Sequence, residues 1–254
     1  MELTQPTTRT LEAPGATLTY DVRPGSGGEI PLFLIGSPMG AAGFGSLASH
    51  FPDRTIITYD PRGAERSTKA DPSTESNPDQ HADDLHRIIQ EVGGPVDLFA
   101  SSGGAVNALA LVAKHPEDVR RLVAHEPPLA SVLPDAENAK AAVRAISDSY
   151  QSGGFGAGMA HFMAITSHRG AFPDDIAQKP APDPSTFGLP SEDDGSRTDV
   201  LLAQNIINTT HYQPDFEALR AASTRIVIAA GAESEGEMRI EAPTRSPSGS
   251  EPSP

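Results

Sequence analysis

The segment from Val96 to Ala113 restricts the fold more than any other part of the chain. A short apolar run ends at Ala100, Ser102 follows, and an alanine-rich pattern of helical character begins at Gly103. A serine on so tight a strand-to-helix turn cannot be buried, and its backbone must adopt a strained conformation. The sequence therefore predicts a buried strand, a sharp turn that presents Ser102, and then a helix.

The small residues around this serine match the spacing of a nucleophile elbow. Ala100 takes the position of the first glycine in the usual G-x-S-x-G pattern, and Gly104 takes that of the second. The pattern makes Ser102 a candidate nucleophile. The alternative explanation is a small residue that is tolerated at a tight turn.

Strand-like and helix-like segments alternate over the first half of the chain. The expected strands are 17–22, 31–35, 55–59, 96–100 and 119–124, and the expected helices are 41–50, 79–92 and 103–114. Such alternation predicts an α/β fold with a mostly parallel, doubly wound sheet. Active groups in such sheets collect on loops at the carboxyl ends of the strands, where Ser37, Ser102 and Glu126 fall.

The alternation stops after residue 128. We expect helices over 137–152 and 199–209, and a return to strand character over 224–230. The tail is mostly Pro, Ser, Gly and charged residues, a composition typical of disorder. The predicted parts are a first core part (1–128), a small helical cap (129–223), the last visible core strand (224–238) and a disordered tail (239–254).

Composition narrows the classes of function. The formal net charge of −15 argues against nucleic acid and against an anionic membrane as partners. The absence of cysteine excludes disulfides and thiolate chemistry. No signal-like segment opens the chain, and no apolar run reaches the ~18–20 residues that span a bilayer. We expect a cytoplasmic protein that acts on a small molecule, with its oligomeric state left open.

We expect no cofactor and no metal site. The neighbours Asp83 and Asp84, and the acidic run 192–194, indicate a solvated acidic surface, because further metal ligands are not evident beside them. The glycines of 153–156 follow a helix and lack the Lys-Ser/Thr pair of a phosphate-binding loop.

Four local patterns, taken in order, resemble the α/β-hydrolase fold superfamily from about residue 8 to residue 237. They are the loop 35–38 (family pattern His-Gly-x-Pro), the turn 60–67 (Asp-x-Arg-Gly-x-Gly-x-Ser), the elbow 100–104 and the strand 224–231. Ile35 replaces the histidine of the first pattern, and Glu65 replaces a glycine of the second. Asp60 and Arg62 are expected to be structural, since turn formation and charge pairing explain them.

The resemblance implies an esterase-like member in which Ser102 attacks an ester-like carbonyl and forms an acyl-enzyme. The backbone N–H groups of Ser37 and Gly103 would hold the developing oxyanion. Two glutamates are candidates for the acid. Glu233 is slightly favoured over Glu126, and Glu235 is a weaker choice.

The resemblance also places a histidine after the acid, on a loop between one more strand and a closing helix. No histidine follows His211 in this chain, and core-forming residues become rare after Met238. We therefore expect a chain that lacks this strand, histidine and helix, through truncation, a frameshift or an altered reading of the gene. His125, beside Glu126, is the best substitute base.

His211 and His161 are weaker candidates for that role. Four further histidines are expected to be solvated or hydrogen-bonded without a catalytic role: His50, His81, His86 and His115.

These patterns predict a serine-type hydrolase for an ester-like small molecule, with activity impaired by the missing histidine. Two alternatives are open. One is a catalytically inactive, truncated hydrolase-fold protein. The other is a metal-free haloperoxidase or perhydrolase-like enzyme, which shares the serine.

Overall fold

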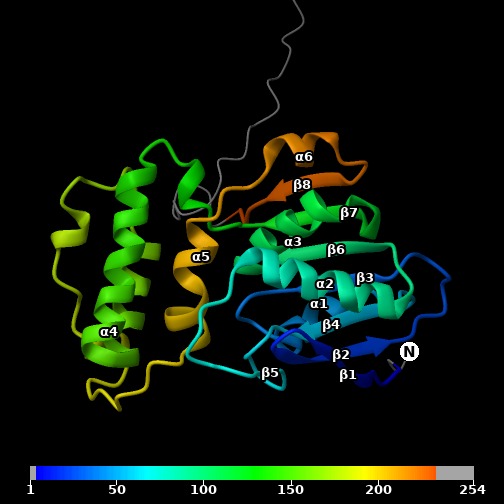
Figure 1. The fold of residues 1–254 in the computed structure, drawn as a ribbon, viewed down its shortest axis with the longest axis horizontal. Helices are drawn as coiled ribbons and strands as arrows, with labels where there is room; N and C mark the ends of the chain where they lie inside the picture. The colour runs from blue at the N-terminus through cyan, green and yellow to red at the C-terminus, as the bar shows by residue number, and fades with distance from the viewer. Residues whose placement is uncertain (1–3, 233–254) are drawn as a thin grey trace, which may run out of the picture.

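The computed structural model describes residues 4–232, which form a mixed sheet with helices on both faces and a helical cap to one side (Figure 1). The predicted α/β class is confirmed. Glu233, Glu235 and the tail 239–254 lie outside the described residues, so the expectations about them stay predictions. No helix within residues 4–232 combines the length and the apolar character needed to cross a membrane.

Within residues 4–232 the sheet has eight strands in the order β1–β2–β4–β3–β6–β7–β8, with β5 paired to β2 beside this path. The pairs of β2 with β1, β4 and β5 are antiparallel, and the pairs from β4 across to β8 are parallel. The strands are β1 (Thr7–Ala13), β2 (Ala16–Arg23), β3 (Leu32–Ile35), β4 (Ile56–Asp60), β5 (Thr68–Lys69), β6 (Val96–Ser101), β7 (Val119–His125) and β8 (Arg225–Ala229).

Helices cover the two faces of the sheet unequally. The larger apolar cluster lies on the face that carries α2, α3 and α6, and a smaller one lies under α1. At the β8 edge, Val227 and Ile228 are 41% and 38% exposed. The α-helices are α1 (Gly45–Ser49), α2 (Pro78–Val92), α3 (Gly103–Lys114), α4 (Ala136–Thr166), α5 (Ile206–Thr210) and α6 (Phe216–Ala221).

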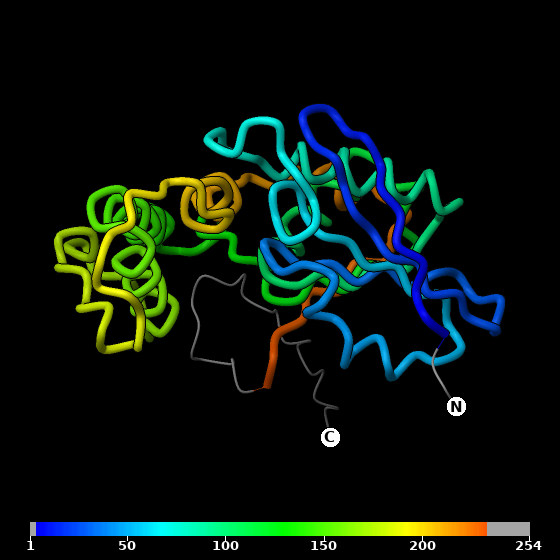
Figure 2. Tube along the Cα trace, turned by 90° about the horizontal axis from the view of Figure 1, so that it is seen from below, coloured from blue at the N-terminus to red at the C-terminus, as the bar shows by residue number. Residues whose placement is uncertain are grey.

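The cap lies beyond the carboxyl ends of the parallel strands (Figures 1 and 2). It consists of α4, the π-helical turn η6 (Val200–Asn205), α5 and short connecting turns, and it has its own apolar cluster. The helix predicted over 137–152 continues to Thr166, because Gly154 (φ 74°) produces a kink instead of ending the helix. α6 falls inside the range 129–223 but packs on α3. The predicted domain boundaries stay a prediction.

Strand β1 was not predicted, because most of it is exposed and its sequence shows little alternation of apolar residues.

Hydrogen bonds to a charged side chain stabilise the turn that follows β4. Asp60 accepts hydrogen bonds from the Arg66 guanidinium (2.6 Å) and from the Ala41 N–H (2.8 Å). The structural role expected for Asp60 agrees with these contacts.

A buried ion pair fastens α2 to this turn. The Arg62 guanidinium donates two hydrogen bonds of 2.7 Å to the carboxylate of Asp84, and the two side chains are 5% and 1% exposed. The prediction that Asp84 lies on a solvated surface is therefore wrong. Asp84 shares one face of α2 with Leu85 and Ile88, which are both buried.

Replacing Asp84 with asparagine should lower the free energy of unfolding by about 3–5 kcal/mol, because the Arg62 charge stays buried without its partner. Asp83→Asn is the matched control. Asp83 is exposed and pairs with Lys114 at the surface, so its loss should cost less than about 1 kcal/mol. Urea unfolding followed by circular dichroism measures both, and similar losses for the two variants would contradict the role given to the buried pair.

Candidate active site

Ser102 occupies the strained turn that the sequence predicts. It lies between β6 and α3 with φ 55° and ψ −130°, a backbone conformation that L-residues rarely adopt, and its side chain is exposed. Its N–H donates to the carbonyl of His125 at 2.9 Å, which ties the turn to the end of β7. The hydrogen bond to β7 thus maintains the strained conformation, and the strained turn presents the Ser102 hydroxyl at the edge of the sheet.

The two glycines after Ser102 allow α3 to begin directly against the loop that follows β3. A Cβ on Gly103 would stand 2.8 Å from the Ser37 carbonyl oxygen, and a Cβ on Gly104 would stand 2.8 Å from backbone atoms of Gly36. Contacts this short exclude a larger side chain unless the backbone moves. The small residues of the elbow therefore set the separation between the helix and this loop.

The same contact brings together the two backbone amides expected to form an oxyanion site. Within residues 4–232, no acceptor is hydrogen-bonded to the Ser37 N–H. Gly103 is the first residue of α3, and the first N–H groups of a helix have no partner within it. Both residues line the cavity that Ser102 faces. The arrangement can offer two donors to an oxygen atom bound beside Ser102.

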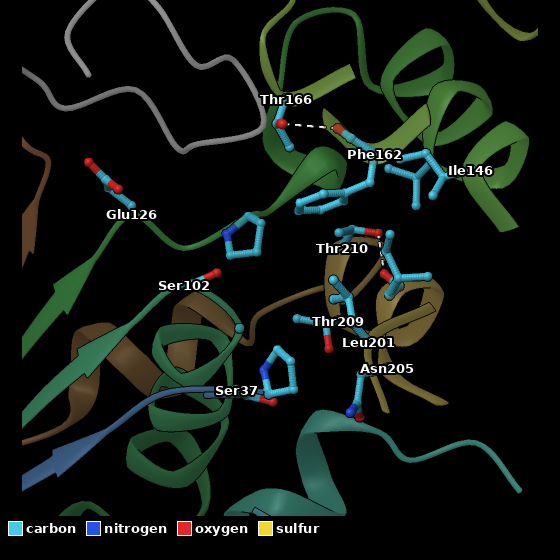
Figure 3. Close-up of a pocket in the computed structure, with 15 residues that line it drawn as sticks. Ser37, Ser102, Glu126, Ile146, Phe162, Thr166, Leu201, Asn205, Thr209 and Thr210 are labelled. Carbon is cyan, nitrogen blue, oxygen red and sulfur yellow. Dashed lines mark hydrogen bonds between the residues drawn. The ribbon is translucent and has the colours of Figure 1, made fainter. Parts of the chain in front are cut away.

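A cavity of about 270 Å³ lies between Ser102 and the cap. In Figure 3 the Ser102 hydroxyl points towards this space, and Phe162, Ile146 and Leu201 lie across from it. Val143 and Ile206 complete the apolar wall. The size and lining are typical of a site for a small molecule.

Most polar side chains of the cavity are already hydrogen-bonded within the protein. The hydroxyls of Thr166 and Thr210 donate to backbone carbonyls one turn earlier, at 2.9 and 2.7 Å. The Asn205 amide donates to the Val200 carbonyl (2.7 Å), and its oxygen lies 3.1 Å from Nε2 of the buried His81. The Thr209 hydroxyl has no partner among the described residues. Apart from the Thr209 hydroxyl, the cap side of the cavity therefore offers a ligand few free hydrogen-bonding groups.

Glu126 lies at the end of β7 with φ 53° and lines the cavity. Its N–H donates to the Ala229 carbonyl (2.9 Å), and its Oε1 accepts from the Gly231 N–H (2.8 Å). In Figure 3 the carboxylate points away from the Ser102 hydroxyl. These contacts join the ends of β7 and β8.

The His125 side chain lies between two polar neighbours. Its Nδ1 is 3.2 Å from the Ser101 hydroxyl, and its Nε2 is 3.6 Å from Oε1 of Glu126. No residue within 4–232, His125 included, hydrogen-bonds the Ser102 hydroxyl. His125 contributes its carbonyl to the elbow, whereas its ring faces Ser101 and Glu126.

The two cap histidines do not line the cavity. His161 Nδ1 lies 2.8 Å from the Ser149 hydroxyl, and burial lowers the pKa of this imidazole. Burial also lowers the pKa of His211. Both are therefore biased towards the neutral form.

Three polar residues of the cavity floor were not predicted: Asn205, Thr209 and Thr210. They fall in a segment for which helical character was expected, but no local pattern indicates that they face Ser102. The buried face of α2, in contrast, does have a signal in the sequence. His81 and Asp84 recur with Leu85 and Ile88 at helical spacing, and all four are buried.

The sequence pattern of the alpha/beta hydrolase fold matches residues 32–211, and the chain belongs to that family. The resemblance inferred from the four local patterns is thereby confirmed.

Two curated relatives match this chain over part of their length. The uncharacterized hydrolase YraK of Bacillus subtilis (strain 168) is 38% identical over 126 residues, which cover 49% of this chain and 46% of that protein. The 2-(acetamidomethylene)succinate hydrolase of Mesorhizobium japonicum is 35% identical over 109 residues, or 42% of this chain and 38% of that protein. The chain thus spans less than half of each of these relatives.

The fold has many solved counterparts. An alpha/beta hydrolase enzyme from a Medee basin deep-sea metagenome library superimposes with a TM-score of 0.62 at 15% sequence identity, covering 87% of this chain and 78% of that one. At this identity the similarity concerns the fold.

Replacing Ser102 with glycine should relieve the strain at φ 55°, because glycine has no Cβ. We expect Ser102→Gly to be about 1 kcal/mol more stable than Ser102→Ala, since strain of this kind exceeds the conformational cost of glycine. Both variants lose the hydroxyl, so the pair isolates the backbone. Urea unfolding of the two proteins tests this, and an alanine variant at least as stable as the glycine variant would refute it.

Proposed function

We propose that this protein is a serine hydrolase that cleaves an ester-like small molecule through an acyl-enzyme on Ser102. The observation that carries the proposal is the exposed hydroxyl on a strained turn, which faces a cavity beside the backbone amides of Ser37 and Gly103. Ser102 Oγ would bond to the carbonyl carbon while the alcohol leaves. Water would then release the acid.

The cavity supports a small, uncharged acyl group. Its wall is made of aliphatic and phenyl side chains, and its threonine and asparagine side chains are mostly engaged by the protein. None of the described lining residues is lysine or arginine. The name of the Mesorhizobium relative indicates a succinate derivative as its substrate. A dicarboxylate would be desolvated in this cavity without a cationic partner, so we do not transfer that substrate.

A second candidate is a ligand-binding protein without catalytic activity. A serine hydroxyl is a weak nucleophile unless a base accepts its proton. The observation that favours this candidate is that no described side chain hydrogen-bonds the Ser102 hydroxyl. Oxyanion donors and binding alone would leave ~10³–10⁴-fold acceleration over water.

Hydrolysis of p-nitrophenyl esters by the purified chain tests the proposal. We expect turnover of the acetate and butyrate esters above buffer, and none by Ser102→Ala. An ester whose acyl group carries a carboxylate should be cleaved at least ~10-fold more slowly than butyrate, because the site would desolvate its charge. Equal rates for wild type and Ser102→Ala would rule out the acyl-enzyme and favour the binding protein.

His125 accepts the Ser102 N–H at its carbonyl, and its ring lies 3.6 Å from the Glu126 carboxylate. We propose that this ring turns from Ser101 towards Ser102 and acts as the base. His125→Ala should then abolish the activity that depends on Ser102, as measured by the same ester assay. His50→Ala is the control, because His50 is an exposed residue at the end of α1. Unchanged turnover in His125→Ala would exclude His125 as the base and leave the role of Ser102 intact.

A further inference from the structure

Two histidines and an aspartate meet at the opposite end of α3 from Ser102. His115 caps the C-terminus of α3, Asp118 ends the adjoining turn η2 (Pro116–Asp118), and His86 reaches them from α2. Since α3 has 12 residues, this cluster lies about 18 Å from the elbow. It belongs to neither the cavity nor the oxyanion site.

The three side chains converge closely. His86 Nδ1 is 2.6 Å from Oδ2 of Asp118, and the rings of His86 and His115 stack with centroids 3.8 Å apart. One ligand atom from each residue lies within 4.8 Å of the other two. The other Asp118 oxygen accepts a hydrogen bond of 2.9 Å from the Gln90 amide, which orients the carboxylate towards the imidazoles.

The charges of the cluster favour a cation. Asp118 is only 2% exposed, and within residues 4–232 no lysine or arginine forms an ion pair with it. A buried carboxylate requires a compensating positive charge. A divalent cation would satisfy the carboxylate and both imidazoles together.

We propose that His86, His115 and Asp118 bind a zinc-like divalent transition metal that fastens α2 to the end of α3. Two imidazole nitrogens and one carboxylate oxygen suit Zn²⁺, whereas Mg²⁺ and Ca²⁺ prefer oxygen ligands alone. Zn–N bonds of about 2.0–2.1 Å require the ligand atoms to close in from their present separation. The 26% exposed ring of His115 can turn out of the stack to do so.

The fourth ligand comes from water or from Glu117. The Glu117 carboxylate lies 3.7 Å from His115 Nδ1, and the Glu117 side chain is 68% exposed. The site lies away from Ser102 and the cavity. Bound metal should therefore change the stability of the protein, whether or not the protein is a hydrolase. The inference is therefore independent of the proposed function.

Titration of ZnCl₂ into the full chain after removal of metals with EDTA tests the proposal by isothermal calorimetry. We expect one Zn²⁺ per chain, a higher melting temperature with Zn²⁺ than without it, and no response to Mg²⁺. Co²⁺ in place of Zn²⁺ should give the visible absorption bands of a tetrahedral site with nitrogen and oxygen ligands. Absence of Zn²⁺ binding to the folded chain would overturn the proposal.

Variants locate the site. His86→Ala and His115→Ala should each weaken Zn²⁺ binding at least tenfold, while His50→Ala keeps the affinity of the wild type. Asp118→Asn provides a further variant in which the hydrogen bond to Gln90 can be retained, and it should weaken binding in the same way. Affinities that are the same in the cluster variants and in His50→Ala would assign the metal to another place and refute the site.

Discussion

The close contact between the start of α3 and the loop after β3 is the constraint on which the site depends. Gly103 and Gly104 allow it, because a Cβ on either would collide with the backbone of Ser37 or Gly36. The Ser102 N–H, bonded to the His125 carbonyl, holds the turn in its strained conformation. The Ser102 hydroxyl and the backbone amides of Ser37 and Gly103 are therefore positioned by one packing arrangement around three parallel strands.

Ion pairs and hydrogen bonds of charged side chains connect the elements that surround this packing arrangement. The Arg62–Asp84 pair joins α2 to the turn after β4, and Asp60 holds the same turn through Arg66 and the Ala41 N–H. The helix face that carries Asp84 also carries His81, whose ring contacts Asn205 at the cavity floor. Buried polar contacts thus join α2 both to the turn after β4 and to the cap.

The sequence predicted the parts of this protein whose signals are local. The strand, serine, glycines and helix around Ser102 follow from the order of small and apolar residues, and the structure has them where expected. The acidity of Asp84 suggests solvent exposure, whereas its helical spacing with Leu85 and Ile88 places it on the buried face of α2. The kink at Gly154 and the cavity floor at Thr209 depend on contacts between distant segments, so no local pattern could reveal them.

The contact of Gly104 with Gly36 has a mechanical consequence. Because α3 and the loop after β3 touch through their backbones, a displacement of one is transmitted to the other. We therefore expect the amides of Ser37 and Gly103 to move together and to adjust little to ligands of different shape. Adaptation to a ligand falls to the opposite wall, which is formed by side chains of the kinked α4 and of the π-helical turn η6.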